Sequence, residues 1–149
     1  MRGVNEMNKY IEMKKRHQEE VNKFPKFFAF SEKRFNEQMI ERGLDPKQDL
    51  DKILSINGGG FILRSDEEKF DAMFARQAKE LSDAIAANED NFIVDMFKYE
   101  LANHEYIITG NISDTLNAIG LSGEEVNNNE ALRKGLAEAI KQYTADCDC

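Results

Sequence analysis

Carboxylate, amide and imidazole side chains share one side of a helix predicted from about residue 91 to residue 105. Advancing each residue by about 100° around the axis places Glu100, Asn103 and His104 in the same arc as the apolar residues. Glu100 and His104 are four residues apart, so their side chains can meet at one point. We expect this group to face inward. A buried polar group without partners costs about 1 to 3 kcal/mol, so it must be hydrogen-bonded or open to a cleft.

His17, the other histidine of the chain, lies on the apolar face of an earlier predicted helix, between Met13 and Val21. If the two helices pack together, His17 joins the inward polar group, and Tyr106 supports it. A carboxylate and an imidazole at this spacing can ligate one ion or hold one proton in place. The candidate ligand-binding residues are therefore His17, Glu100, Asn103, His104 and Tyr106, and the candidate metal ligands are Glu100 and His104.

The same pattern also suits a structural polar network that closes the end of the helix. Two ligands make an incomplete metal site, and the sequence offers no third ligand at comparable spacing. A structural network is preferred, followed by a cleft for a small ligand, a nucleotide or a metal, and then by a minor hydrolase built on His17, Glu100 and His104. No residue is assigned a catalytic role, and the cofactor stays unknown.

Other motifs give weaker signals. The Asn57–Gly60 run lacks the Gly-Lys-Ser/Thr ending of a phosphate-binding loop, which favours a hairpin tip. The Cys147-Asp148-Cys149 segment lacks the second cysteine pair of a zinc site, which favours a terminal tail. The chain also lacks a Gly-x-Ser-x-Gly elbow and a His-Glu-x-x-His pair. These patterns favour a protein that is not an enzyme.

The elements that must position these residues form an α+β pattern. Apolar residues at helical spacing predict helices over residues 8–24, 32–42, 65–85, 91–105, 114–119 and 129–143. Short apolar runs predict buried strands at 27–30, 53–56 and 61–64, and 106–109 can add another. Ser31 and Ser65 are predicted helix caps. We expect a small antiparallel sheet of about three strands packed against four to six helices.

The chain length of 149 residues fits a single domain. We expect one globular domain over residues 7–143, an N-terminal extension over residues 1–6 and a flexible tail over residues 144–149. Met7 is an alternative start to Met1, because the helical pattern begins just behind it.

An acidic charge balance limits the partners. The chain carries 28 acidic and 20 basic residues, and its net charge of −8 is spread without a basic stripe. Direct nucleic-acid binding is therefore not expected, and a basic protein partner would suit this surface. No apolar run has the length of a membrane span and no signal-peptide pattern begins the chain, so we expect a cytoplasmic protein without a membrane partner. The oligomeric state stays unknown.

Four segments carry a resemblance to a known group of proteins. They are Phe27–Phe30, Gly58–Ile62, Phe97–Tyr106 and Asp114–Leu121. Together they resemble a family of small uncharacterised proteins from gut-type bacteria and their phages or mobile elements, over about Met7 to Tyr143. The Tyr-Glu-Leu-x-Asn-His-Glu-Tyr block is its most specific part. The resemblance implies no activity, but it implies a setting in which small acidic accessory proteins bind and modulate a host or defence protein.

Overall fold

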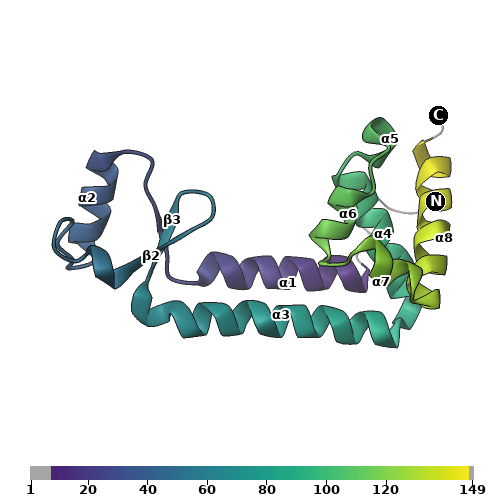
Figure 1. The fold of residues 1–149 in the computed structure, drawn as a ribbon, viewed down its shortest axis with the longest axis horizontal. Helices are drawn as coiled ribbons and strands as arrows, with labels where there is room; N and C mark the ends of the chain where they lie inside the picture. Colours follow the sequence, from purple (N-terminus) through teal and green to yellow (C-terminus); the bar gives the residue numbers. More distant parts are fainter. Residues whose placement is uncertain (1–7, 148–149) are drawn as a thin grey trace. The chain divides into compact units, whose positions relative to one another are not determined.

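The computed structural model describes residues 8–147, which form helices and one small sheet (Figure 1). In chain order the elements are α1 (Lys9–Lys23), β1 (Phe27–Phe28), α2 (Glu32–Glu41), η1 (Leu50–Lys52), β2 (Ile53–Ile56), β3 (Gly60–Leu63), η2 (Arg64–Asp66), α3 (Glu67–Ala87), η3 (Glu89–Asn91), α4 (Phe92–Asn103), α5 (Tyr106–Thr109), α6 (Ser113–Ala118), α7 (Gly123–Asn127) and α8 (Glu130–Cys147). The predicted α+β class with a three-stranded antiparallel sheet is confirmed. None of the described helices is long and apolar enough to cross a membrane.

The described chain divides into two compact units. Residues 17–80 form one, called the sheet unit below, and residues 8–16 with 81–147 form the other, called the helical unit. The boundary falls within α1 and within α3, so each of these helices contributes to both units. Two compact units can belong to one domain, so the single domain over residues 7–143 stays a prediction. The extension over residues 1–6 lies outside the described residues.

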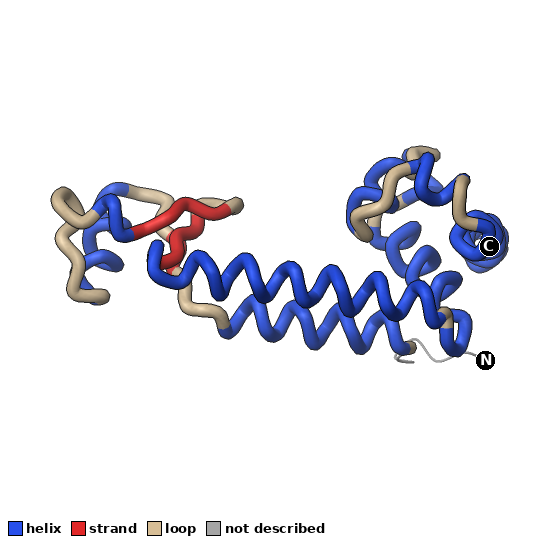
Figure 2. Tube along the Cα trace, turned by 60° about the horizontal axis from the view of Figure 1, so that its bottom comes forward, coloured by secondary structure: helices blue, strands red, loops and turns tan. Residues whose placement is uncertain are grey.

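The sheet unit has the strand order β1-β3-β2, with both pairs antiparallel (strands red in Figure 2). Successive side chains of a strand point to opposite faces of a sheet, and one of these faces packs on α2 in a small hydrophobic cluster. Its cluster consists of Phe27, Met39 and Ile53, with Phe35, Leu44, Phe61 and Leu63 partly buried against them. The predicted cap Ser31 is confirmed, since its hydroxyl accepts from the Arg34 amide at 3.2 Å. Ser65 instead lies inside the short helix η2.

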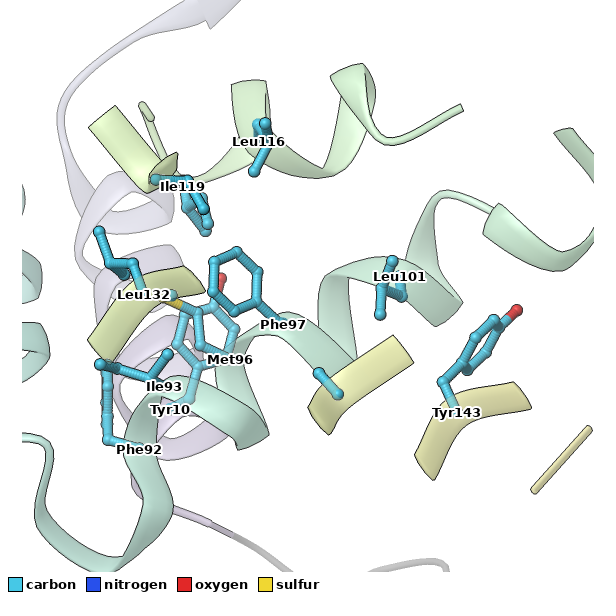
Figure 3. Packing of buried hydrophobic residues seen from close by; sticks show 12 residues of the cluster. Tyr10, Phe92, Ile93, Met96, Phe97, Leu101, Leu116, Ile119, Leu132 and Tyr143 are labelled. Atoms are coloured by element: carbon cyan, nitrogen blue, oxygen red, sulfur yellow. The ribbon is translucent and has the colours of Figure 1, made fainter. Parts of the chain in front are cut away.

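The helical unit has its core around α4, whose apolar residues face α6, α7 and α8 (Figure 3). Phe92, Ile93, Met96, Phe97 and Leu101 are each at most 2% exposed. The short helix α7 was not predicted; it begins with a full capping box between Ser122 and Glu125.

The predicted strand over residues 106–109 is wrong, because these residues form the helical turn α5. Glu105 takes a left-handed backbone conformation with φ of 52°, which separates the turn from α4. Gly110, with φ of 65°, closes the turn by donating its amide to Tyr106 at 2.8 Å. A four-residue apolar run fits a strand or a helical turn equally well, and here the flanking backbone decides.

Helix α8 continues four residues beyond its predicted end at Tyr143. Residues 144–147 contain neither proline nor glycine, and Lys98 on α4 forms an ion pair with Asp146 at 3.3 Å. Residues 144–147 of the predicted tail are therefore helical, and the flexibility of the tail stays a prediction. Asp148 and Cys149 lie outside the described residues, so the soft-metal alternative stays untested.

Close contact between α4 and α8 depends on Gly135. A Cβ atom at this position would overlap the Cγ2 methyl of Ile93, which is 1% exposed. Helix propensity alone would make alanine about 1 kcal/mol better than glycine. We expect the overlap to dominate, so that Gly135→Ala lowers the free energy of unfolding by about 1 to 3 kcal/mol in urea denaturation.

Gly123 in α7 provides the matched control, because a Cβ atom there would meet nothing within 4 Å. Gly123→Ala should leave the stability unchanged within about 0.5 kcal/mol or raise it slightly. A Gly135→Ala variant as stable as the parent would contradict the packing described for α4 and α8.

Candidate functional site

Glu100 is a fully buried glutamate in the core of the helical unit. It lies on α4 beside Phe97 and Leu101, and all three residues are 0% exposed. The inward orientation predicted from helical spacing is therefore confirmed for Glu100. A buried carboxylate needs partners, because its desolvation is costly unless charge and hydrogen bonds compensate it.

Two side chains of α1 supply these partners. The Tyr10 hydroxyl donates a hydrogen bond to Glu100 Oε2, and Lys14 Nζ lies 2.5 Å from the same oxygen. Tyr10 and Lys14 are four residues apart, so they share one face of α1. The Lys14 ammonium also lies 5.0 Å from the ring centroid of Tyr99, a distance typical of a cation–π contact. Glu100 is thus neutralised by Lys14 and oriented by Tyr10.

The second carboxylate oxygen faces His104. Glu100 Oε1 lies 3.4 Å from His104 Nε2, and neither atom has a hydrogen-bond partner among the described residues. His104 is partly buried and follows the last residue of α4. The four-residue spacing thus brings Glu100 and His104 together, as predicted. A protonated imidazole would form an ion pair with the carboxylate across this distance.

Thr115 adds a third connection from α6. Its hydroxyl donates to the Glu100 backbone oxygen at 3.4 Å, and the residue is fully buried. Sequence reasoning missed Thr115, Tyr10 and Lys14 as parts of this site. The helical phase put Tyr10 on the apolar face, but spacing along the chain does not identify a partner 90 residues away.

Two other predicted members of the site lie differently. The inward orientation of Asn103 is wrong, because its side chain is exposed at the point where α4 ends. Tyr106 is partly buried, and its ring packs against Tyr143 with 6.5 Å between centroids. A ligand-binding role for Asn103 and Tyr106 stays a prediction.

His17 belongs to the sheet unit and has its own acidic partner. Its Nε2 contacts Glu80 Oε2 on α3, and Glu80 also pairs with Arg76 at 3.0 Å. Gln77 Nε2 donates to the His17 backbone oxygen at 3.3 Å. The hydrogen bonds described for His17 therefore connect it to α3. Its membership in a group with Glu100 and His104 stays a prediction.

An open pocket of about 430 Å³ lies elsewhere in the helical unit, between α1 and the end of α3. Its lining includes Lys9, Glu12 and Asp83 around Met13 and Ala84, and none of the predicted site residues. Lys9 is already paired with Glu89 at 2.9 Å and Asp90 at 3.2 Å. Within residues 8–147, no three His, Cys, Asp or Glu side chains are grouped as a metal site requires.

A second candidate site lies at the tip of the β2–β3 hairpin. Gly59 has a left-handed φ of 81°, and a Cβ atom there would come within 2.6 Å of the Phe30 ring. At Gly60, a Cβ atom would come within 2.8 Å of the Phe28 ring and 3.0 Å of Ile56. The two aromatic rings therefore lie directly against glycine backbone.

The aromatic side chains at this tip are exposed. Phe30 is 82% exposed and Phe28 is 42% exposed. Of the buried strand predicted over residues 27–30, the strand is confirmed for Phe27–Phe28 and the burial for Phe27, whereas the burial predicted for Phe28 and Phe30 is wrong. Phe28, Gly60 and Ile56 are paired across the three strands and share one face of the sheet. We call Phe28, Phe30 and Ile56, with Gly59 and Gly60 between them, the tip patch.

Comparison with protein families gives one match that covers most of the chain. The model of a family of unknown function (DUF7659) matches residues 9–142. The chain matches no curated protein and no solved structure. The match agrees with the expected membership in a family without an assigned activity.

The Glu100 site allows a direct test of its structural role. Glu100→Ala removes the acceptor of Tyr10 and the counter-ion of Lys14, so it should lower the free energy of unfolding by about 2 to 4 kcal/mol. Glu138→Ala, an exposed glutamate of α8, should cost less than about 0.5 kcal/mol. Urea denaturation of both variants measures the difference, and equal losses would contradict the burial of Glu100.

A metal or ligand site would behave differently. Glu100→Gln keeps the shape of the side chain, so it should leave stability unchanged or raise it if the carboxylate is retained for binding. Melting with a chelator or with divalent ions shifts the parent but not Glu100→Gln under that alternative. The structural network predicts destabilisation of Glu100→Gln and no metal-dependent shift.

Tyr10 gives the site a pH dependence. Burial, and then the hydrogen bond to Glu100, raises the pKa of the Tyr10 phenol above its ordinary value of 10.0. The folded chain therefore keeps this proton where the unfolded chain releases it. The resulting stability is fully present below about pH 10 and is lost as the pH rises further. Tyr10→Phe should therefore show a smaller fall in melting temperature between about pH 9 and 11 than the parent, and parallel curves would contradict this assignment.

Proposed function

Because the chain belongs to DUF7659, a family of unknown function, we propose its function from its own residues: it binds another protein through the tip patch of the sheet unit. The observation that supports this proposal is the exposure of Phe30 beside Phe28. Exposed aromatic clusters are typical of protein-binding surfaces, because burying such side chains supplies much of the binding energy.

The charge distribution around the tip patch supports the same function. Residues 27–31 and 53–63 contain no acidic or basic residue, although charged residues make up 32% of the whole chain. The centre of a protein interface is typically depleted of charge and enriched in aromatic residues. The strands of the sheet have this composition, and charged residues such as Lys26 and Glu32 flank the first strand on either side.

The glycines at the tip strengthen the proposal. Part of the Phe28 ring lies close to Gly60 and part of the Phe30 ring lies close to Gly59, while the rest of each ring is open to solvent. A side chain that is already oriented loses less conformational entropy when a partner covers it. The tip patch is therefore suited to serve as a binding surface without rearrangement of its backbone.

The setting of this function is also proposed. The net charge of −8 favours a partner with basic surface around the contact and disfavours nucleic acid. The resemblance to proteins of bacterial phages and mobile elements supports a cytoplasmic accessory protein that binds and modulates a host or defence protein.

A small-ligand or metal-binding function is the second candidate. The unpartnered atoms Glu100 Oε1 and His104 Nε2, 3.4 Å apart, are the observation that favours it. The compensation of Glu100 by Lys14 and Tyr10 favours the structural network instead. The melting experiment on Glu100→Gln separates these two roles.

A binding experiment tests the protein-binding function. Phe30→Ser removes the most exposed ring of the tip patch, so it should weaken binding to a partner captured from the native host by about tenfold or more. The fold should be retained, because this side chain is 82% exposed. Affinity for the purified partner is measured by titration calorimetry.

Ile40→Ser is the matched control. Ile40 is 65% exposed on α2 in the same unit, and it lies outside the tip patch. Its substitution should change the affinity by less than about threefold. Equal affinities of Phe30→Ser and the parent would contradict a role of the tip patch in binding.

A further inference from the structure

We propose that the outer edge of β2 accepts an extended, uncharged segment of a partner protein as a fourth strand of the sheet. This inference rests on the proposed protein-binding function and specifies the partner chemistry that the sheet unit fits. Strand addition uses main-chain hydrogen bonds for affinity and alternate side chains for specificity.

The position of β2 in the sheet makes this pairing available. The strand order β1-β3-β2 leaves β2 at an edge, where Ile53–Ile56 pairs only with β3 among the described strands. The guanidinium of Arg64 donates to the Ile53 backbone oxygen at 3.4 Å, at the start of the strand. Ser55 is exposed, and Ile56 is paired with Gly60 of the tip patch. The open part of the edge therefore lies next to the tip patch.

The two edges of the sheet differ in their protection. Edge strands are commonly blocked by a short length, a proline or a charged side chain. The β1 edge is two residues long, follows Pro25, and has the Arg42 guanidinium 4.4 Å from the Phe27 ring centroid. The β2 edge is four residues long and contains neither a charge nor a proline. At β2 only the start of the strand is occupied, by the Arg64 guanidinium on the Ile53 backbone oxygen and by the Ile53 amide, which donates to Leu50. The Ser55 end of β2 therefore keeps the features that allow a further strand to pair.

Side chains beside this edge define the partner segment. Leu54 and Ile56 share the face of the tip patch, and Ser55 lies on the opposite face. No charged residue lies between Lys52 and Arg64, so β2 and β3 themselves offer no ionic partner to a charged side chain placed against them. The segment that fits therefore alternates apolar residues with small polar residues such as threonine.

A second copy of this chain fits the edge less well than such a segment. Each copy carries a net charge of −8, and like charges oppose the close approach of two copies. A partner that carries such a segment would also cover the tip patch with its own surface. The proposed occupant is thus a heterologous protein with an exposed, uncharged strand.

The test uses the full chain and a defined probe. The probe is an acetylated and amidated Thr-Val-Thr-Val-Thr-Val peptide, and its control carries N-methyl groups on the amides of both edges, which prevent strand pairing from either side. Amide hydrogen exchange is followed by NMR. At millimolar peptide we expect exchange at the open positions of residues 54–56 to slow about tenfold, and the N-methylated peptide to have no effect.

A pair of variants adds an internal control. Ser55→Lys places a charge on the proposed edge and should reduce the protection by the peptide about tenfold. Ser65→Lys, an exposed position outside the sheet, should leave it unchanged. Absence of protection, or equal protection by the N-methylated peptide, would overturn the strand-addition proposal. Protection that depends on protein concentration without peptide would replace it with self-pairing.

The test of strand addition and the test of the proposed protein-binding function can fail independently of each other. If Phe30→Ser weakens the captured partner but Ser55→Lys and the peptides have no effect, protein binding by the tip patch stands and strand addition fails. If Phe30→Ser leaves that partner's affinity unchanged, the proposed function fails, whatever the peptide does at β2.

Discussion

The buried carboxylate of Glu100 is the constraint around which the helical unit is arranged. A charge among the fully buried residues of α4 requires a counter-ion and a donor, and α1 provides both in Lys14 and Tyr10. Tyr10 also packs its ring against Phe92, with 5.8 Å between centroids. Tyr10 thus takes part both in the apolar core and in the hydrogen bonding of the Glu100 carboxylate. The packing of α1 on α4 therefore depends on a specific polar contact as well as on apolar burial.

The remainder of α1 forms a comparable polar connection within the sheet unit. Glu20 contacts Arg76 and accepts from Gln77 at 2.8 Å, next to the contact of His17 with Glu80. Phe24, which directly follows α1, packs its ring on Phe70 of α3, at 5.2 Å between centroids. Polar pairs therefore set which side chains of α1 and α3 face each other within this unit, where apolar contact alone would allow several registers.

Periodicity in the sequence predicts the local parts of this arrangement. The burial of Glu100, its contact with His104 and the glycine-containing hairpin all follow from spacing within a few residues. The sequence does not predict that Tyr10 meets Glu100, because no local rule connects residues so far apart. The sequence does not predict the exposure of Asn103 for a related reason. Helical spacing gives the side of α4 on which a residue lies, but not how far along α4 the neighbouring helices cover that side.

The division of the chain has a consequence for protein synthesis. Residues 17–80 are contiguous, whereas the helical unit combines residues 8–16 with residues that follow position 80. During translation at about 5 to 20 residues per second, the sheet unit can close as soon as its last helix emerges. Glu100 is synthesised about 1 to 4 seconds later at this rate, and until then the face of α1 that carries Tyr10 and Lys14 is open to water and to chaperones.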